Sequence, residues 1–292
     1  MLGKFQQTHR YIQWVFVLIL LVSHVGCSGL RANNEMPAVA NGVLAQGKQL
    51  FHAGKLSDAE HIFSEAIQKT PGQHSLLNAR GFVYAKQKNW GDAMKDFTLA
   101  IKLAPQHLQY RENLGIVYLE AGYPGKAIRQ FSLILEHTKN SPKILNYRGL
   151  AFNRLAKYQN AIHDFSRALS YEHPQAEMYL NRAVAYLHIG KTGEARKDLD
   201  QAITQNQTLH QAYESRGLLA LLNGDTALAI NDLTAAIRLG SDGGLVHYHR
   251  GMALSMAGHN TKAQRDYDVA CQQQVIHACR HISKSIHAHH QL

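Results

Sequence analysis

The chain has 292 residues, of which 45% are apolar and 18% are charged. This composition excludes a disordered tail and a collagen-like fibre, because both lack the apolar surface that a folded core needs. Three cysteines are too few for a small scaffold held together by disulfides. Lys and Arg outnumber Asp and Glu by 31 to 21, which gives a formal net charge of +10.

Residues 1–26 have the features of a secretory signal peptide. Lys4 and Arg10 precede an apolar run from Tyr11 to Val22, and no acidic residue occurs before Glu35. A retained transmembrane anchor is the alternative, although the run is shorter than the roughly 20 residues that a membrane span needs. Removal of the segment takes away only Lys4 and Arg10, which lowers the net charge from +10 to +8.

The end of this segment, Val25-Gly26-Cys27, resembles the lipobox of bacterial lipoproteins. The resemblance implies that Cys27 becomes the lipidated first residue of the mature chain and that residues 27–39 form a lipid-anchored tether. Ser28 follows the cysteine, which in this family is compatible with sorting to the outer membrane. We therefore expect a periplasm-facing protein of the bacterial envelope, on the outer membrane rather than the inner. Ordinary signal-peptidase cleavage, with Cys27 left as a free thiol, is the alternative.

A period of 34 residues accounts for residues 40–277 without insertion or deletion. The seven windows are 40–73, 74–107, 108–141, 142–175, 176–209, 210–243 and 244–277. The eighth position is always small: Gly47, Gly81, Gly115, Gly149, Ala183, Gly217 and Gly251. The twentieth position is always alanine, and the twenty-fourth is large: Phe63, Phe97, Phe131, Phe165, Leu199, Leu233 and Tyr267. Each window also holds two amphipathic runs that are separated near its fifteenth position, which predicts a pair of helices.

This pattern resembles the tetratricopeptide repeat (TPR) family. The resemblance implies an all-α fold, namely a right-handed α-solenoid of seven 34-residue helix–turn–helix repeats. Residues 278–292 are expected to add a short C-terminal capping helix with a frayed tail. Since one repeat cannot bury its own apolar face, stability must come from the stacking of neighbours.

Charged residues at positions seven and twenty-three occur together or not at all. Five windows have Arg at position seven and Asp at position twenty-three: Arg80 and Asp96, Arg148 and Asp164, Arg182 and Asp198, Arg216 and Asp232, and Arg250 and Asp266. The first and third windows lack both charges. We predict a structural ion pair across each of these five hairpins, and the loss of one partner would strand a partly buried charge.

In the TPR family the first helix of each repeat lines a concave face, where ligands bind. The resemblance places eleven residues of positions five and nine on that face: Asn78, Phe82, Glu112, Ile116, Asn146, Leu150, Val184, Glu214, Leu218, Tyr248 and Met252. An aliphatic stripe flanked by polar groups suits an amphipathic helix or an extended apolar peptide. The alternative is that the stripe belongs partly to the core.

Cys271 and Cys279 have a spacing that resembles the cysteine-bearing Sel1-like repeats, relatives of TPR. The resemblance implies a disulfide between adjacent helices, and export would supply an oxidising compartment. Two reduced, buried thiols are the alternative. His277 and His281 could share a helix face, but isolated imidazoles in a polar tail bind metal weakly, so we predict no metal site.

No motif for catalysis or for cofactor binding stands out in the chain. We therefore predict a scaffold that is not an enzyme and needs no cofactor. The expected partner is a protein of the cell envelope, and nucleic acid is not expected as a partner. Bacterial TPR lipoproteins with a similar architecture include pilotins, tight-adherence pilus lipoproteins and an adaptor for cell-wall hydrolases. Binding of an anionic cell-wall polymer through the basic surface is the second hypothesis.

Overall fold

The computed structural model describes residues 38–280 except residues 139 and 173. Every regular element within this part is an α-helix, so the all-α fold class is confirmed. The predicted signal peptide, Cys27, most of the tether and most of the C-terminal tail lie outside the described residues.

The chain divides into two compact units, and the division falls between Ala168 and Leu169. We call the described parts the amino-terminal unit (38–168) and the carboxy-terminal unit (169–280). The amino-terminal unit contains α2 (Ala38–His52), α3 (Leu56–Lys69), α4 (His74–Lys86), α5 (Trp90–Leu103), α6 (Leu108–Glu120), α7 (Pro124–His137), α8 (Pro142–Arg154) and nearly all of α9 (Tyr158–Leu169).

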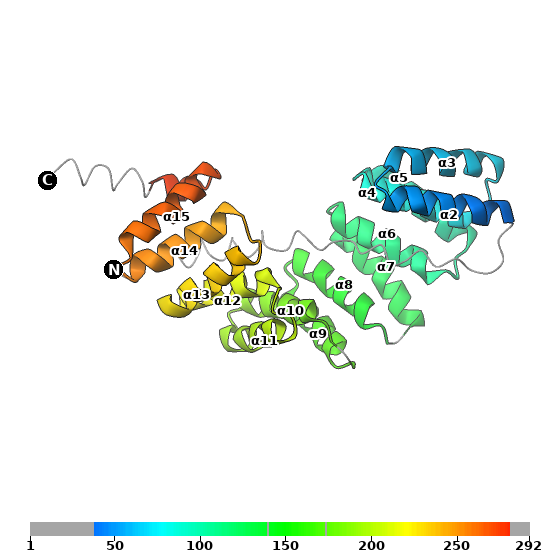
Figure 1. Cartoon of the computed structure of the whole chain (residues 1–292). Helices are drawn as coiled ribbons and strands as arrows, with labels where there is room; N and C mark the ends of the chain where they lie inside the picture. Colours follow the sequence, from blue (N-terminus) through cyan, green and yellow to red (C-terminus); the bar gives the residue numbers. More distant parts are fainter. Residues whose placement is uncertain (1–37, 139, 173, 281–292) are drawn as a thin grey trace. The chain divides into compact units, whose positions relative to one another are not determined.

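The carboxy-terminal unit contains six further long helices and a short helical segment at residues 276–280. The long helices are α10 (Ala176–His188), α11 (Thr192–Gln205), α12 (His210–Leu222), α13 (Thr226–Arg238), α14 (Gly244–Met256) and α15 (Asn260–Gln272). Within each unit, consecutive helices pair into antiparallel hairpins that stack on their neighbours in chain order (Figure 1). No helix of the described part has both the length and the apolar character that crossing a bilayer requires.

The turn inside each hairpin has the same backbone structure in all seven described hairpins. The residue at position fifteen has a positive φ in every one, and in each turn the next residue's N–H donates to the carbonyl five residues before it, as in Lys55 to Leu50. This bond satisfies a carbonyl that the end of the helix would leave unpaired. Five of these residues are glycine, while Lys88 and Ala156 adopt φ values of 60° and 56°.

The small residue at position eight lets the two helices of a hairpin approach closely. A Cβ atom added to Gly149 would lie 2.6 Å from the ring of Phe165, which is much closer than carbon atoms normally come. The phenylalanines at position twenty-four are fully buried, at 2% exposure or less. The aromatic ring therefore fills the space that the missing side chain leaves.

The core continues from one hairpin to the next. Ala127 and Phe131 of α7 share one apolar cluster with Ile144 and Ala151 of α8. Likewise, Leu199 of α11 clusters with Leu218 of α12 in the carboxy-terminal unit. Each hairpin therefore buries its apolar surface against its neighbour, as expected for a repeat fold.

Candidate functional site

The arginines and aspartates of positions seven and twenty-three are in contact in all five hairpins that have them. The Nε to Oδ2 distance is 2.8 Å for Arg80–Asp96, 2.7 Å for Arg148–Asp164, Arg182–Asp198 and Arg216–Asp232, and 2.8 Å for Arg250–Asp266. A second guanidinium nitrogen donates to Oδ1 in each pair, so the contacts are bidentate. The aspartates are buried, and Arg216 has a raised pKa because Asp232 accepts its hydrogen bond.

The arginine also reaches back to the preceding hairpin, which the sequence analysis did not foresee. Nη1 of Arg148 donates to Oγ of Ser132 at 3.1 Å, and the equivalent bonds join Arg80 to Ser64, Arg216 to Asp200 and Arg250 to Thr234. A polar residue recurs at position twenty-five of the sequence windows, and this recurrence could have predicted the contact. These five arginines are therefore structural. Each one pairs with the aspartate of its own hairpin, and four of them also donate a hydrogen bond to the preceding hairpin.

The eleven candidate residues of positions five and nine do not form one exposed surface. Six of them are buried: Asn78, Phe82, Val184, Glu214, Leu218 and Tyr248. Val184 and Leu218 belong to the apolar core of the carboxy-terminal unit, which is the alternative that the sequence left open. The remaining five are partly exposed, namely Glu112, Ile116, Asn146, Leu150 and Met252.

Four of the five partly exposed residues lie on two neighbouring helices, α6 and α8. Glu112 and Asn146 both occupy position five of their windows. Ile116 and Leu150 both occupy position nine. Both aliphatic side chains pack at the edge of the same apolar cluster. We define the α6–α8 face as the residues at positions two, five, nine and thirteen of these helices: Gln109, Glu112, Ile116, Glu120, Lys143, Asn146, Leu150 and Arg154.

Two ion pairs bridge α6 and α8 on either side of the aliphatic row. Nζ of Lys143 lies 2.6 Å from Oε1 of Glu112, and Nη2 of Arg154 lies 3.7 Å from Oε1 of Glu120. Arg154 also donates to the backbone carbonyl of Leu119. The face thus presents acids on α6, bases on α8, and an apolar row between the two pairs.

A row of amides fixes the neighbouring helix α4 to the same face. Nδ2 of Asn113 donates to Oδ1 of Asn78 at 2.7 Å, and Nε2 of Gln109 donates to Oδ1 of Asn113 at 3.1 Å. Asn78 and Asn113 are buried, so their bond links α4 to α6 internally. Gln109 is partly exposed at the end of the row.

The candidate residues of the carboxy-terminal unit are more deeply buried than those of α6 and α8. Glu214 is buried there, and burial raises the pKa of its carboxyl, which accepts a hydrogen bond from Oγ of Ser241 at 3.1 Å. His249 is fully buried, with no hydrogen-bond partner for either ring nitrogen in the described structure, and burial lowers its pKa to about 4. Of the candidate residues in this unit, only Met252 remains partly exposed.

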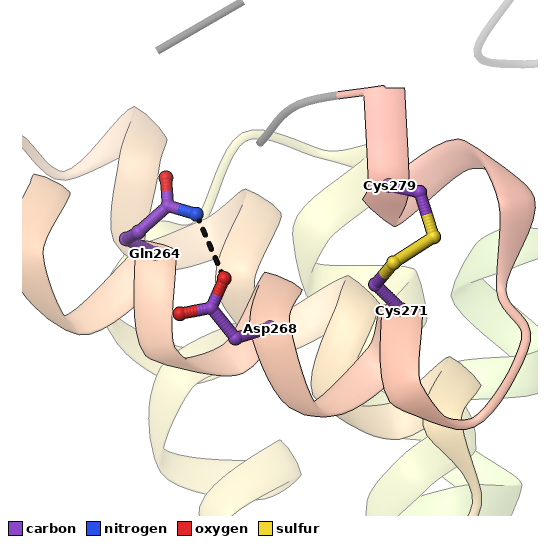
Figure 2. Close-up of a disulfide and its surroundings, with 4 residues drawn as sticks. All are labelled: Gln264, Asp268, Cys271 and Cys279. Carbon is purple, nitrogen blue, oxygen red and sulfur yellow. Dashed lines mark hydrogen bonds between the residues drawn. A yellow bond between two sulfur atoms is a disulfide. The ribbon is translucent and has the colours of Figure 1, made fainter. Parts of the chain in front are cut away.

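Cys271 and Cys279 lie side by side at the end of the described chain. Their Sγ atoms are 2.00 Å apart, which joins the end of α15 to the short helical segment that follows (Figure 2). The chain turns between them at Gln274, where φ is 64°. Within residues 38–280, no cluster of His, Cys, Asp and Glu could hold a metal ion.

Two models of the tetratricopeptide repeat family match the chain, one over residues 74–107 and one over residues 147–209. No curated protein is significantly similar to it in sequence.

Solved structures with the same fold are more widespread. A tetratricopeptide repeat protein from Parabacteroides merdae is 22% identical with a TM-score of 0.66, over 80% of this chain and 92% of that one. The C-terminal part of a TPR protein from Cytophaga hutchinsonii is 15% identical with a TM-score of 0.58, over 79% and 95% of the chains. Pseudomonas aeruginosa PilF is 12% identical with a TM-score of 0.64, over 73% and 97%. The chain therefore contains tetratricopeptide repeats within residues 74–107 and 147–209, and it shares the fold of these solved TPR structures.

Proposed function

We propose that this protein is a non-enzymatic scaffold of the bacterial envelope that binds a protein partner through the α6–α8 face. A lipid on Cys27 would hold it on a membrane, with the outer membrane favoured. TPR repeats generally serve protein–protein interaction, and the α6–α8 face holds four of the five candidate residues that are partly exposed. The partner would act in envelope assembly, such as the building of a pilus or a secretion apparatus.

The observation that carries this proposal is the charge pattern of the α6–α8 face. Glu112 and Glu120 are held on α6 by Lys143 and Arg154 of α8, so four charges occupy defined positions. The side chain of Lys143 is half-exposed, so its ammonium group can also donate a hydrogen bond to a carboxylate of a partner. Charges held in place before binding favour specific partners more than they raise affinity.

The apolar row defines the kind of segment that fits. Ile116 and Leu150 are partly exposed between the two ion pairs, so they can receive one or two apolar side chains. An amphipathic helix or an extended segment with apolar anchors and flanking charges meets these requirements. The candidate residues Phe82, Val184 and Leu218 are buried, so they would not touch the partner.

A charge swap on the α6–α8 face tests the proposal directly. The double variant Glu112→Lys with Lys143→Glu keeps an ion pair between the helices but reverses the charges that a partner would meet. The full chain is purified from its own membranes in mild detergent, and copurifying proteins are quantified by mass spectrometry. We expect one partner to be depleted at least tenfold from the swap variant.

The matched control swaps a second pair that lies away from this face. Asp92 and Lys95 form an exposed pair on α5 at 2.9 Å, and their exchange should leave the partner's yield unchanged. Equal recovery of the partner with both swaps would show that the α6–α8 face does not bind it.

The proposed anchor and the proposed disulfide can be tested together. Mass spectrometry of the mature protein should find an acylated Cys27 at the first position and a mass that is two hydrogens lower for the linked Cys271 and Cys279. An unmodified Cys27, or a chain that still begins upstream of it, would remove the lipid anchor from the proposal.

A further inference from the structure

The net positive charge of this protein comes from its amino-terminal unit. Residues 38–168 contain 17 Lys and Arg against 9 Asp and Glu, whereas residues 169–292 contain 11 of each. The excess of eight charges in the first unit equals the whole net charge that remains without residues 1–26. Basic residues that served only solubility would have no reason to leave their whole excess over acidic residues in one half.

Exposed lysines recur at the turns inside the four hairpins of this unit. Lys55 lies in the first turn, Lys86 and Lys88 lie in the second, Lys126 follows the third, and Lys157 lies in the fourth. All five are exposed, and none forms an ion pair with a carboxylate in the described structure. Because every hairpin reverses the chain, these turns share one end of the stacked first helices, which we call the turn edge.

Aromatic and aliphatic side chains accompany the lysines on the turn edge. Tyr123 is 47% exposed and Leu155 is 40% exposed, although both side chains are largely apolar. Trp90 and Tyr158 are partly exposed just after the second and fourth turns. Nζ of Lys126 lies 4.8 Å from the centre of the Tyr123 ring.

Most carboxylates near the turn edge are already neutralised. Asp92 accepts hydrogen bonds from Lys95 and from the amide of Asn89, and Glu120 pairs with Arg154. In the carboxy-terminal unit, Lys191 lies 4.0 Å from Glu194, Asp225 occupies the next turn, and Lys262 alone follows the third turn. Exposed lysines without a carboxylate partner are therefore more frequent at the turns of the amino-terminal unit.

We propose that the turn edge lies on the surface of an anionic lipid bilayer. Flexible lysines gain roughly 1 kcal/mol each near such a surface, and they adapt to mobile headgroups without fixed geometry. Tyr and Trp side chains prefer the headgroup region, where an apolar ring and a polar tip are both accommodated. An acidic protein partner would instead favour lysines held in fixed positions by paired charges, and none of the five lysines forms an ion pair in the described structure.

This inference goes beyond the proposed scaffold function and does not depend on it. None of the five lysines belongs to the α6–α8 face, so a protein partner and a membrane could be bound together. The interaction also needs no lipid on Cys27, since it arises from residues 55–158 alone.

The experiment uses the chain from Ser28 onward, which lacks the apolar leader. All described helices and their contacts lie within residues 38–280, so this truncation removes none of the packing. The sequence has only two tryptophans, Trp14 and Trp90, and the truncated chain keeps Trp90 alone. Its fluorescence therefore reports on the turn edge specifically.

Binding is measured with vesicles of phosphatidylglycerol and phosphatidylcholine and with vesicles of phosphatidylcholine alone. We expect the Trp90 emission to shift to the blue, and brominated lipids to quench it, with the anionic vesicles only. The variant K86Q/K88Q/K126Q/K157Q should bind on the order of 1,000-fold more weakly. The control K69Q/K102Q/K197Q/R238Q removes four exposed basic residues that lie away from the turns inside the hairpins, and it should bind within a few-fold of the unchanged chain.

Three results would overturn the proposal. Equal weakening of both variants would mean that diffuse charge, not the turn edge, attracts the vesicles. Binding to neutral vesicles would indicate apolar insertion. Absence of vesicle binding, together with salt-sensitive binding to polyglutamate or to purified cell wall, would assign the turn edge to an acidic protein or a polymer. Because partner recovery is measured separately, failure here leaves the scaffold function intact.

Discussion

At the scale of single residues, the arginine of position seven contributes most to the order of the stack. Arg148 joins Asp164 of its own hairpin to Ser132 of the hairpin before it. Asp164 is only 1% exposed, so its charge is compensated by this arginine rather than by water. Such a pair is costly to break from one side, because the remaining charge stays buried.

The substitution Asp164→Asn should therefore lower the free energy of unfolding by about 3–5 kcal/mol. Urea denaturation followed by circular dichroism measures the change. Asp92→Asn, which removes a carboxylate from an exposed pair, should cost about 1 kcal/mol or less. If both substitutions had equal effects, the burial of the Asp164 pair would contribute nothing to stability.

The third hairpin lacks the Arg–Asp pair of positions seven and twenty-three. Leu114 and Gln130 occupy positions seven and twenty-three there, and the buried Oε1 of Gln130 has no hydrogen-bond partner in the described structure. Thr98 precedes this hairpin at the position where Thr234 accepts a hydrogen bond from Arg250. The site thus has every element of the pair except the two charges.

Introducing both charges should recreate the missing pair. Leu114→Arg and Gln130→Asp are each expected to destabilise the protein, because each alone buries an unpaired charge. A double-mutant cycle should give a favourable coupling of about 1–3 kcal/mol between them. Strict additivity of the two losses would mean that the pattern of positions seven and twenty-three does not specify the contact.

His249 makes stability depend on pH. Its imidazole is fully buried, and its pKa is lowered from 6.5 to about 4. The unfolded chain therefore takes up a proton below about pH 6.5 that the native protein takes up only near pH 4. Stability is fully present above pH 6.5 and falls as the pH is lowered toward 4.

Between pH 7.5 and pH 5, this residue should remove about 2 kcal/mol of stability. Denaturation of the unchanged protein and of His249→Leu at both pH values isolates its share, since His74, His188 and His210 shift in the same direction in both. A pH dependence that is identical in the two proteins would show that His249 is protonated in the folded state.

At the scale of elements, the last described hairpin is covered by the segment that follows it. Ala278 is fully buried in one cluster with Tyr248, Tyr267 and Ala270, and Val275 packs at its edge. A disulfide between Cys271 and Cys279, which lie side by side here, would hold this segment in place (Figure 2). This covering segment is short, so a covalent restraint helps to offset the conformational entropy that it loses on ordering.

The double variant C271S/C279S should therefore unfold with a free energy about 2–3 kcal/mol lower, as expected for closing so short a loop. Adding a reductant to the unchanged protein should give the same loss, whereas the double variant should not respond to it. Equal stability of the two proteins without reductant would mean that the cysteines are not joined in the purified protein.

At the scale of the whole molecule, the sequence period was sufficient to predict the helix pairs. The small residues, alanines and aromatic residues recur because the distance between the two helices of a hairpin must recur. Lys88 and Ala156 departed from the glycine pattern, yet their turns keep the same hydrogen bond and a positive φ. Stacking on neighbouring hairpins can hold such strain, which a local sequence pattern does not reveal.

The candidate site was harder to predict, because exposure depends on the neighbouring helix rather than on the position within a repeat. Leu150 and Leu218 both occupy position nine, but Leu150 is partly exposed while Leu218 is fully buried. The bridging Lys143 and Arg154 lie at positions two and thirteen, where no recurring residue type drew attention. Only the placement of α6 beside α8 brought them to Glu112 and Glu120.

Three features described above would then act together in one scaffold. The arginine contacts hold the hairpins in register, the α6–α8 face would receive a partner, and the turn edge would lie on a membrane. The central claim among these is that a protein binds the α6–α8 face.

Site-specific photo-crosslinking in living cells tests that claim most directly. A photoreactive phenylalanine derivative replaces Leu150 on the α6–α8 face, or Leu99, which is 42% exposed on α5. We expect one defined adduct from position 150 that is absent from position 99 and is lost in the Glu112→Lys, Lys143→Glu background. Adducts that form equally from both positions, or that persist after the charge swap, would contradict the assignment of the face.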